Sequence, residues 1–304
     1  YIKTLLECTK INNLKKNIKV VWDPGNGAAG DIIKKLVGYL PGEHILINED
    51  IDGSFPAHHP DPTDPKNLEE LISIVKNNNF DVGVAFDGDG DRLGLVSGRG
   101  NIIWGDQIVA LLSQEVLKVH PNSPIIADVK ASQTLFNEIK RLGGIPVMWK
   151  TGHSFIKSKM KEISSPLAGE MSGHIFFSDR YYGYDDGIYA ALRVLELICE
   201  NYSLDDFLNS LPKTFSTQEI KINCPDEVKF SIIKDLSLLL DKAGLIVNKI
   251  DGLRVQKDSG WWLLRASNTQ AVLVARIEAD SQDSLNKLQE ELSYYLKKFD
   301  LSLK

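Results

Sequence analysis

The stretch FDVGVAFDGDGDR, residues 80–92, decides how the first part of this chain folds. Its first half is a short apolar run of the kind that forms a buried strand. Its second half alternates three carboxylates, Asp87, Asp89 and Asp91, with two glycines, which let the backbone turn sharply where the strand ends. We therefore expect the three carboxylates to converge on one point beyond the end of a buried strand.

Converging carboxylates predict a bound cation. Three such groups repel one another unless a cation lies between them, and a hard divalent ion such as Mg²⁺ prefers oxygen ligands. Arg92 follows directly and adds a planar cation suited to a phosphate oxygen. The loop therefore predicts a Mg²⁺ site that handles a phosphorylated ligand. A solvated acidic turn is the alternative, whereas an EF-hand is excluded because Arg92 and Gly98 occupy its Gly and Glu positions.

The composition narrows the class of protein. The 304 residues are 43% hydrophobic and 25% charged, as in an ordinary soluble globular protein of two or three domains. The net charge of −6 argues against a nucleic-acid or membrane surface, so we expect neither partner. No apolar run reaches transmembrane length, and the start has no signal-peptide pattern. Because Cys8, Cys199 and Cys224 are scattered, we expect no disulfide framework and a cytoplasmic protein.

The order of apolar patterns predicts the fold class. Strands alternate with helices up to about residue 200, which is typical of mainly parallel α/β sheets. The remainder predicts an antiparallel α+β arrangement, with strands near 249–256, 260–265 and 271–278 between helices 226–243 and 281–298. We expect two mixed or mainly parallel three-layer α/β domains and a smaller α+β domain, with boundaries 1–101, 102–212 and 213–304. Residues 1–16 are expected to form a leading amphipathic helix.

A glycine motif supplies a rival interpretation. Residues 25–30, GNGAAG, fit the G-x-G-x-x-G pattern of a dinucleotide-binding turn, and acidic residues follow about 20 positions later. A dinucleotide-binding oxidoreductase is therefore an alternative. Two observations weaken it: Pro24 separates the strand from the first glycine, and a dehydrogenase has no need of the metal and phosphate loops found elsewhere in the chain. A structural turn is the other interpretation of the motif.

A second loop, GEMSGH at residues 169–174, has the groups that bind a sugar. The Glu170 carboxylate accepts hydrogen bonds from adjacent hydroxyls, Ser172 donates or accepts, and His174 donates to a hydroxyl or a phosphate. The flanking glycines keep the loop thin enough for close approach. A polar surface turn with an ordinary histidine is the alternative.

A third loop, RASNT at residues 265–269, is dense in hydrogen-bond donors. The guanidinium of Arg265 lies next in sequence to the side chains of Ser267, Asn268 and Thr269 and to several backbone N–H groups, a combination that suits a phosphate dianion. The alternative is a hairpin turn whose polar side chains satisfy the local backbone.

Two further basic residues follow predicted strands. Lys130 and His153 stand where strands give way to helices, and ligands in α/β sheets bind at those carboxyl ends. Simple solvation is the alternative for both. The loop AHHPDP at residues 57–62 has metal-ligand residue types, but its prolines predict a structural role.

The three loops, in this order and spacing, resemble the α-D-phosphohexomutase family, of the phosphomannomutase/phosphoglucomutase type. The resemblance implies that Asp87, Asp89 and Asp91 hold Mg²⁺, and that Glu170 and Ser172 bind the hydroxyls of a hexose phosphate. It further implies that the 265–269 loop holds the non-reacting phosphate. For the catalytic steps it implies a set of four residues, Arg92, Lys130, His153 and His174. The sequence departs from the family in one place, because Gln270 and Ala271 replace its usual Glu-Pro.

The family reaction interconverts mannose or glucose 1- and 6-phosphates through a phosphoserine and a bisphosphorylated sugar. That serine lies in an N-terminal domain, within a Thr-Ala-Ser-His-Asn-Pro-like segment that has no counterpart in residues 1–304. We therefore expect a mutase fragment that lacks this domain and is inactive alone, and its start at Tyr1 fits that expectation. A sugar-phosphate-binding protein without catalysis is the alternative.

Overall fold

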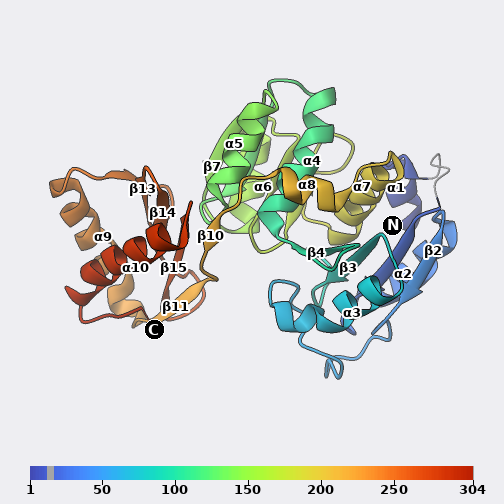
Figure 1. Cartoon of the computed structure of the whole chain (residues 1–304), viewed down its shortest axis with the longest axis horizontal. Coiled ribbons are helices and arrows are strands. Elements are labelled where there is room, and N and C mark those ends of the chain that lie inside the picture. The colour runs from blue at the N-terminus through green and yellow to red at the C-terminus, as the bar shows by residue number, and fades with distance from the viewer. Residues whose placement is uncertain (12–16, 304) are drawn as a thin grey trace. The chain divides into compact units, whose positions relative to one another are not determined.

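The computed structural model describes residues 1–11 and 17–303 and forms two compact units, Tyr1–Leu211 and Pro212–Lys304. The first unit contains two mixed sheets with helices on their faces, and the second contains one antiparallel sheet with two long helices (Figure 1). The predicted fold class is therefore confirmed. The boundaries of the three expected domains stay a prediction.

The first sheet has the strand order β2-β1-β3-β4-β5. Its β1 pairs in parallel with β2 and β3, whereas β3-β4 and β4-β5 are antiparallel. All five residues of β3 are buried, because the sheet is covered on both faces. The strands are β1 (Lys19–Asp23), β2 (Glu43–Leu46), β3 (Val82–Phe86), β4 (Leu93–Ser97) and β5 (Ile102–Ile103).

The helices of this part of the chain are short. The expected helix over 1–16 is wrong in its length, since α1 ends at Glu7, and residues 12–16 lie outside the described part. The helical segments are α1 (Ile2–Glu7), α2 (Gly30–Leu36), α3 (Glu69–Asn77) and the 3-10 turns η2 (Val37–Tyr39) and η3 (Pro65–Leu68). Leu71 and Val75 of α3 pack against Gly83 of β3, where the missing side chain admits them.

The second sheet has the order β7-β6-β8-β9, parallel except for the last pair. Its strands are β6 (Pro124–Asp128), β7 (Ile145–Trp149), β8 (Leu167–Gly169) and β9 (Ile175–Phe177). The helices are α4 (Gly105–Val119), α5 (Gln133–Arg141), α6 (His153–Ile163), α7 (Gly187–Cys199) and α8 (Leu204–Ser210). Both sheets of the first unit share one core, in which α7 is buried along its whole length.

The second unit is built on an antiparallel sheet of order β10-β15-β14-β13-β12, with β11 also paired to β15. Its strands are β10 (Phe215–Ser216), β11 (Ile220–Asn223), β12 (Ile246–Asn248), β13 (Leu253–Lys257), β14 (Gly260–Ala266) and β15 (Val272–Ala279). The helices α9 (Asp226–Lys242) and α10 (Gln282–Lys297) pack on one face, where they form a core around Trp262 and Leu264 of β14. Sequence patterns missed β10, β11 and β12, because runs of two to four residues show too little alternation.

Among the described residues, no helix is long and apolar enough to cross a membrane.

Candidate functional site

The acidic loop follows β3 directly. The backbone N–H groups of Gly90 and Arg92 donate to Asp87 Oδ1 at 3.2 and 3.1 Å, so this carboxylate holds the turn in place. Gly90 adopts a left-handed conformation with φ of 81°, which a glycine permits at low cost. One oxygen from each of Asp87, Asp89 and Asp91 lies within 4.8 Å of the others. The predicted convergence of these three side chains is therefore present.

The electrostatics of this loop suit a cation. Burial raises the pKa of Asp87 to about 6, and the negative charges of Asp91 and Asp89 add to that effect. The N–H and charge of Arg92, whose Nε lies 3.2 Å from Asp87 Oδ2, act in the opposite direction. A divalent cation bound between the carboxylates relieves their repulsion. An all-oxygen donor set with one buried member and two more open ones fits Mg²⁺ with several bound waters.

The acidic loop and the 169–174 loop are joined by their backbones. Leu93, where β4 begins, donates its N–H to Gly173 O at 2.9 Å, and Arg92 forms an antiparallel bridge with His174. A Cβ on Gly173 would lie 2.7 Å from Leu93 O, so only glycine fits there. The structure thus brings two predicted loops, 80 residues apart in sequence, into one ladder.

Glu170 lies in the turn between β8 and β9 and is only 3% exposed. Its Oε1 accepts a hydrogen bond from the Gly152 N–H at 2.5 Å. Burial raises the pKa of Glu170, and the charge of Asp128 adds to that rise. Ser172 lies half-buried in the same turn. The two predicted sugar-binding side chains therefore share one turn, in which Glu170 is the more deeply buried of the two.

His174 is the most highly connected residue of the loop. Its Nε2 accepts from Arg92 Nε at 3.2 Å, and its Nδ1 lies 3.1 Å from Asp185 Oδ2 and 3.4 Å from Asp91 Oδ1. Burial lowers the pKa of His174, but the nearby carboxylate of Asp185 and the charges of Asp91 and Glu170 outweigh burial and raise it. A ring held between a cation and two carboxylates has a defined orientation.

Lys130 and His153 lie at the same edge of the second sheet. Lys130 is 6% exposed, with its Nζ 3.8 Å from Asp128 Oδ2, so it is a buried cation rather than a solvated one. His153 begins α6, and its ring lies 6.2 Å from that of His174 in a nearly parallel arrangement. Lys157 connects the group, because its Nζ lies 3.0 Å from both His153 Nδ1 and Asp185 Oδ1.

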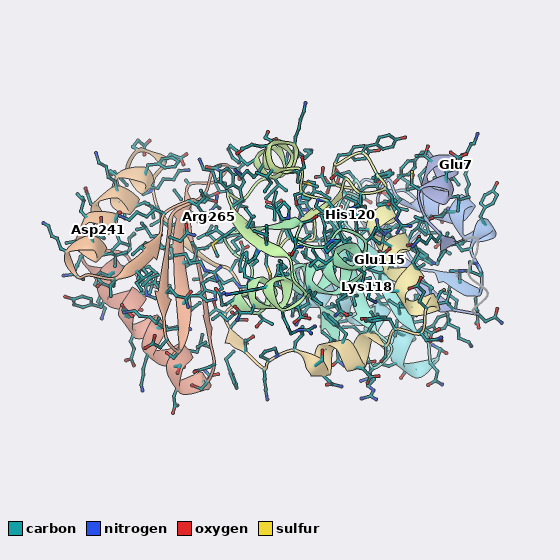
Figure 2. All side chains as sticks on the ribbon, turned by 90° about the horizontal axis from the view of Figure 1, so that it is seen from above. Glu7, Glu115, Lys118, His120, Asp241 and Arg265 are labelled. Carbon is teal, nitrogen blue, oxygen red and sulfur yellow. The ribbon has the colours of Figure 1, made fainter. Side chains whose placement is uncertain are left out.

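The 265–269 loop belongs to the second unit and joins β14 to β15. Arg265 lies near the end of β14 (Figure 2), and its Nε and Nη2 donate to Asp251 at 3.0 and 3.4 Å. Ser267 Oγ accepts from the N–H groups of Thr269 and Gln270 at 3.3 and 3.1 Å, which shapes the turn. The neighbouring Asn268 is exposed. The hairpin turn of the alternative interpretation is present, with Ser267 satisfying the local backbone, and the phosphate-binding role of the loop stays a prediction.

The glycine motif at residues 25–30 contacts the acidic loop. Ala28 N–H donates to Gly88 O at 2.8 Å, and a Cβ on Gly27 would lie 2.7 Å from that same oxygen and 3.0 Å from Asp87 O. The observed contacts of this turn, including a 2.1 Å clash of any Cβ on Gly30 with Glu49 O, favour the structural interpretation.

Sequence reasoning missed three residues beside the predicted loops. In the first unit, Asp185 contacts His174 and Lys157 contacts His153. In the second unit, Lys229 of α9, 4% exposed, donates to Gln270 O at 3.0 Å beside the 265–269 loop. The sequence contained one signal that pointed to Asp185, the Asp-Asp pair before the apolar helix at 187–199. Such a pair is typical of a helix start and does not by itself predict a contact with His174.

Comparison with known proteins gives matches along almost the whole chain. Residues 1–100 match the family model for phosphoglucomutase/phosphomannomutase alpha/beta/alpha domain II. Residues 104–215 match alpha/beta/alpha domain III of the same family, and residues 219–293 match its C-terminal domain.

Individual relatives agree with these models. The chain is 49% identical over 278 residues to a phosphomannomutase/phosphoglucomutase of Pseudomonas putida, covering 91% of this chain and 60% of the relative. It is 45% identical over 280 residues to a phosphoglucomutase of Neisseria meningitidis serogroup A, covering 91% and 61%. A solved phosphoglucomutase/phosphomannomutase family protein of Burkholderia thailandensis superposes with a TM-score of 0.90 at 42% identity, covering 98% of this chain and 63% of that one. The chain thus spans about three fifths of the length of the relatives it matches.

Proposed function

This chain belongs to the phosphoglucomutase/phosphomannomutase family, and from that premise we propose that it contributes metal-binding, sugar-binding and phosphate-binding loops to a mutase that interconverts hexose 1- and 6-phosphates. The observation that carries this proposal is the joining of the acidic loop to the 169–174 loop through Leu93 and Gly173. The carboxylates proposed to hold a cation and the groups proposed to bind sugar hydroxyls thereby lie on segments joined by one backbone ladder. Mannose and glucose phosphates are the proposed substrates, as the relatives' names suggest, and the three free cysteines support a cytoplasmic location.

We propose that Asp87, Asp89 and Asp91 hold Mg²⁺, which when bound polarises the oxygens of a phosphoryl group. The chain's own groups prepare the site for this ligand. Arg92 directs a guanidinium toward the same space as the carboxylates and offers a donor to a phosphoryl oxygen. Its Nε also contacts His174, so the phosphoryl-binding cation and the imidazole are positioned by one contact.

We propose that Glu170 and Ser172 accept and donate hydrogen bonds to the hydroxyls of the hexose. A buried carboxylate is a strong acceptor in a region with little competing water. His174, with its raised pKa, holds or donates a proton near the reacting phosphate. The buried Lys130 places positive charge at the sheet edge where His153 also lies, with its ring beside that of His174. In the second unit, Arg265, Ser267, Asn268 and Thr269 bind a phosphate group.

No segment of this sequence matches the family's phosphoserine segment, so we propose that the isolated chain binds hexose phosphates without interconverting them. In isolation, the chain is therefore expected to act as a sugar-phosphate-binding protein.

The experiment measures two ligands against two variants by calorimetry. Arg265→Lys replaces a guanidinium that can donate two parallel hydrogen bonds by a point charge. The affinities for inorganic phosphate and for hexose phosphate should both fall by roughly 10- to 150-fold. Glu170→Gln should weaken hexose phosphate and leave inorganic phosphate unchanged, because only the hydroxyls use that carboxylate. Arg265→Lys binding like the wild type, or Glu170→Gln impairing both ligands alike, would contradict the assignment of the two loops.

A further inference from the structure

Beside the acidic loop lies a second group of metal-ligand atoms that the proposed Mg²⁺ site does not use. His174 Nδ1 lies 3.1 Å from Asp185 Oδ2 and 3.4 Å from Asp91 Oδ1, and the three atoms lie within 4.8 Å of one another. All three atoms are buried, and among the described residues none of them makes a hydrogen bond of acceptable geometry. His174 as a whole is 9% exposed, so its ring nitrogen is directed into this cluster and away from water.

From this arrangement we infer that Asp91, His174 and Asp185 form a binding site for a borderline divalent cation of the Zn²⁺ or Co²⁺ type. The donor set is the first reason. One imidazole nitrogen and two carboxylate oxygens suit Zn²⁺, whereas Mg²⁺ and Ca²⁺ select oxygen donors alone. Two negative carboxylates balance the charge of the ion, and three protein ligands leave a fourth position for water.

The spacing of the donors is the second reason. With bonds of about 2.0–2.2 Å, a tetrahedral Zn²⁺ site places neighbouring donor atoms roughly 3.3–3.5 Å apart. The two nitrogen–oxygen separations, 3.1 and 3.4 Å, lie close to that spacing without movement of the backbone.

The surroundings of the three ligands orient them. Lys157 Nζ lies 3.0 Å from Asp185 Oδ1, which fixes the carboxylate and leaves Oδ2 directed at His174. On the other side of the ring, Arg92 Nε contacts His174 Nε2 at 3.2 Å. A ring that coordinates a metal through Nδ1 carries its proton on Nε2, so loading the site requires Arg92 to withdraw. Its side chain is 35% exposed and has room to do so.

This site shares Asp91 with the acidic loop but depends on Asp185 and His174, whereas the proposed Mg²⁺ site depends on Asp87 and Asp89. A borderline cation is therefore expected to compete with Mg²⁺ through the shared carboxylate. The two proposals can fail separately, because different substitutions remove the two sites.

The test titrates Co²⁺ into the whole chain and follows its visible absorption, then repeats the titration with Zn²⁺ by calorimetry. The wild type should develop the intense visible bands of four-coordinate Co²⁺. Asp185→Asn and His174→Gln should each lose those bands. The affinity of each variant for Zn²⁺ should fall about 10- to 100-fold or more, because this is the loss seen when a residue that only contacts a metal ligand is replaced. Asp89→Asn should keep the bands and lose Mg²⁺ binding instead.

Mg²⁺ binding by Asp185→Asn and His174→Gln serves as the check that both variants are folded. The inference is overturned if both folded variants bind Co²⁺ and Zn²⁺ like the wild type, or if Asp89→Asn abolishes the Co²⁺ bands. Thiolate charge-transfer bands in place of the visible ones would assign the cation to cysteine and overturn it as well.

Discussion

Gly27→Ala should weaken Mg²⁺ binding although Gly27 offers no ligand. A Cβ at this position would lie 2.7 Å from Gly88 O and 3.0 Å from Asp87 O, both in the acidic loop. Real Cβ contacts stay beyond about 3.0 Å, so the carbonyl of Gly88 has to move outward. Overpacking of this kind typically costs about 1–3 kcal/mol.

The magnitude follows from where that strain is relieved. The turn that contains Gly27 is itself held from its other side, because Asn26 N–H donates to Asn48 O at 2.7 Å and Gly30 has no room beside Glu49 O. The acidic loop is therefore the part that shifts. Mg²⁺ binding requires the loop in its present geometry, so the binding free energy has to offset the whole strain of about 1–3 kcal/mol. The affinity for Mg²⁺ should therefore fall roughly 5- to 150-fold.

The assay is a calorimetric Mg²⁺ titration of four proteins: the wild type, Gly27→Ala, Gly38→Ala and Asp89→Asn. Gly38 is the matched control, because a Cβ there meets nothing within 4 Å. Asp89→Asn marks the result of removing a proposed ligand. The urea midpoint of the first unit, which contains all three substituted positions, checks that each variant remains folded. Gly27→Ala binding Mg²⁺ as tightly as Gly38→Ala would refute the reasoning, and NAD binding lost with Gly27→Ala would favour the dinucleotide alternative.

Three further predictions concern stability and turnover. Arg193→Met removes the buried cation that contacts Asp179 and Glu115 at 2.9 and 2.7 Å (Figure 2 labels Glu115). The free energy of unfolding of the first unit should fall by about 3–5 kcal/mol, while the urea midpoint of the second unit stays unchanged. An unchanged urea midpoint of the first unit would contradict this prediction. The hydrogen bond to Asp23 raises the pKa of His58 to about 9 against the opposing effect of burial. The stabilisation that protonated His58 provides is therefore fully present below pH 6.5 and is lost as the pH rises through about 9. Between about pH 6 and about pH 9.5, the urea midpoint should fall more in the wild type than in His58→Gln. Parallel pH profiles of the two proteins would contradict this prediction. Finally, the chain alone should show no hexose phosphate interconversion with Mg²⁺ and glucose 1,6-bisphosphate, and turnover by clean protein counts against that proposal.

The sequence by itself determined the local chemistry of this protein. Alternating apolar runs and glycines predicted strand β3 and the turn after it, because strand and turn propensities act over a few residues. The spacing of Asp87, Asp89 and Asp91 was enough to predict their convergence for the same reason. The long helices α7, α9 and α10 were also predictable from their apolar patterns.

Only the tertiary structure decided which distant groups meet. Asp185 precedes α7 and reads as a helix start, yet packing of that helix brings it to His174. Gly27 fits a nucleotide-binding pattern, but it contacts Gly88 because β1 and β3 are paired in the sheet, which the sequence pattern does not predict. Such meetings depend on sheet order and on helix packing across long sequence separations, and no short-range propensity encodes them.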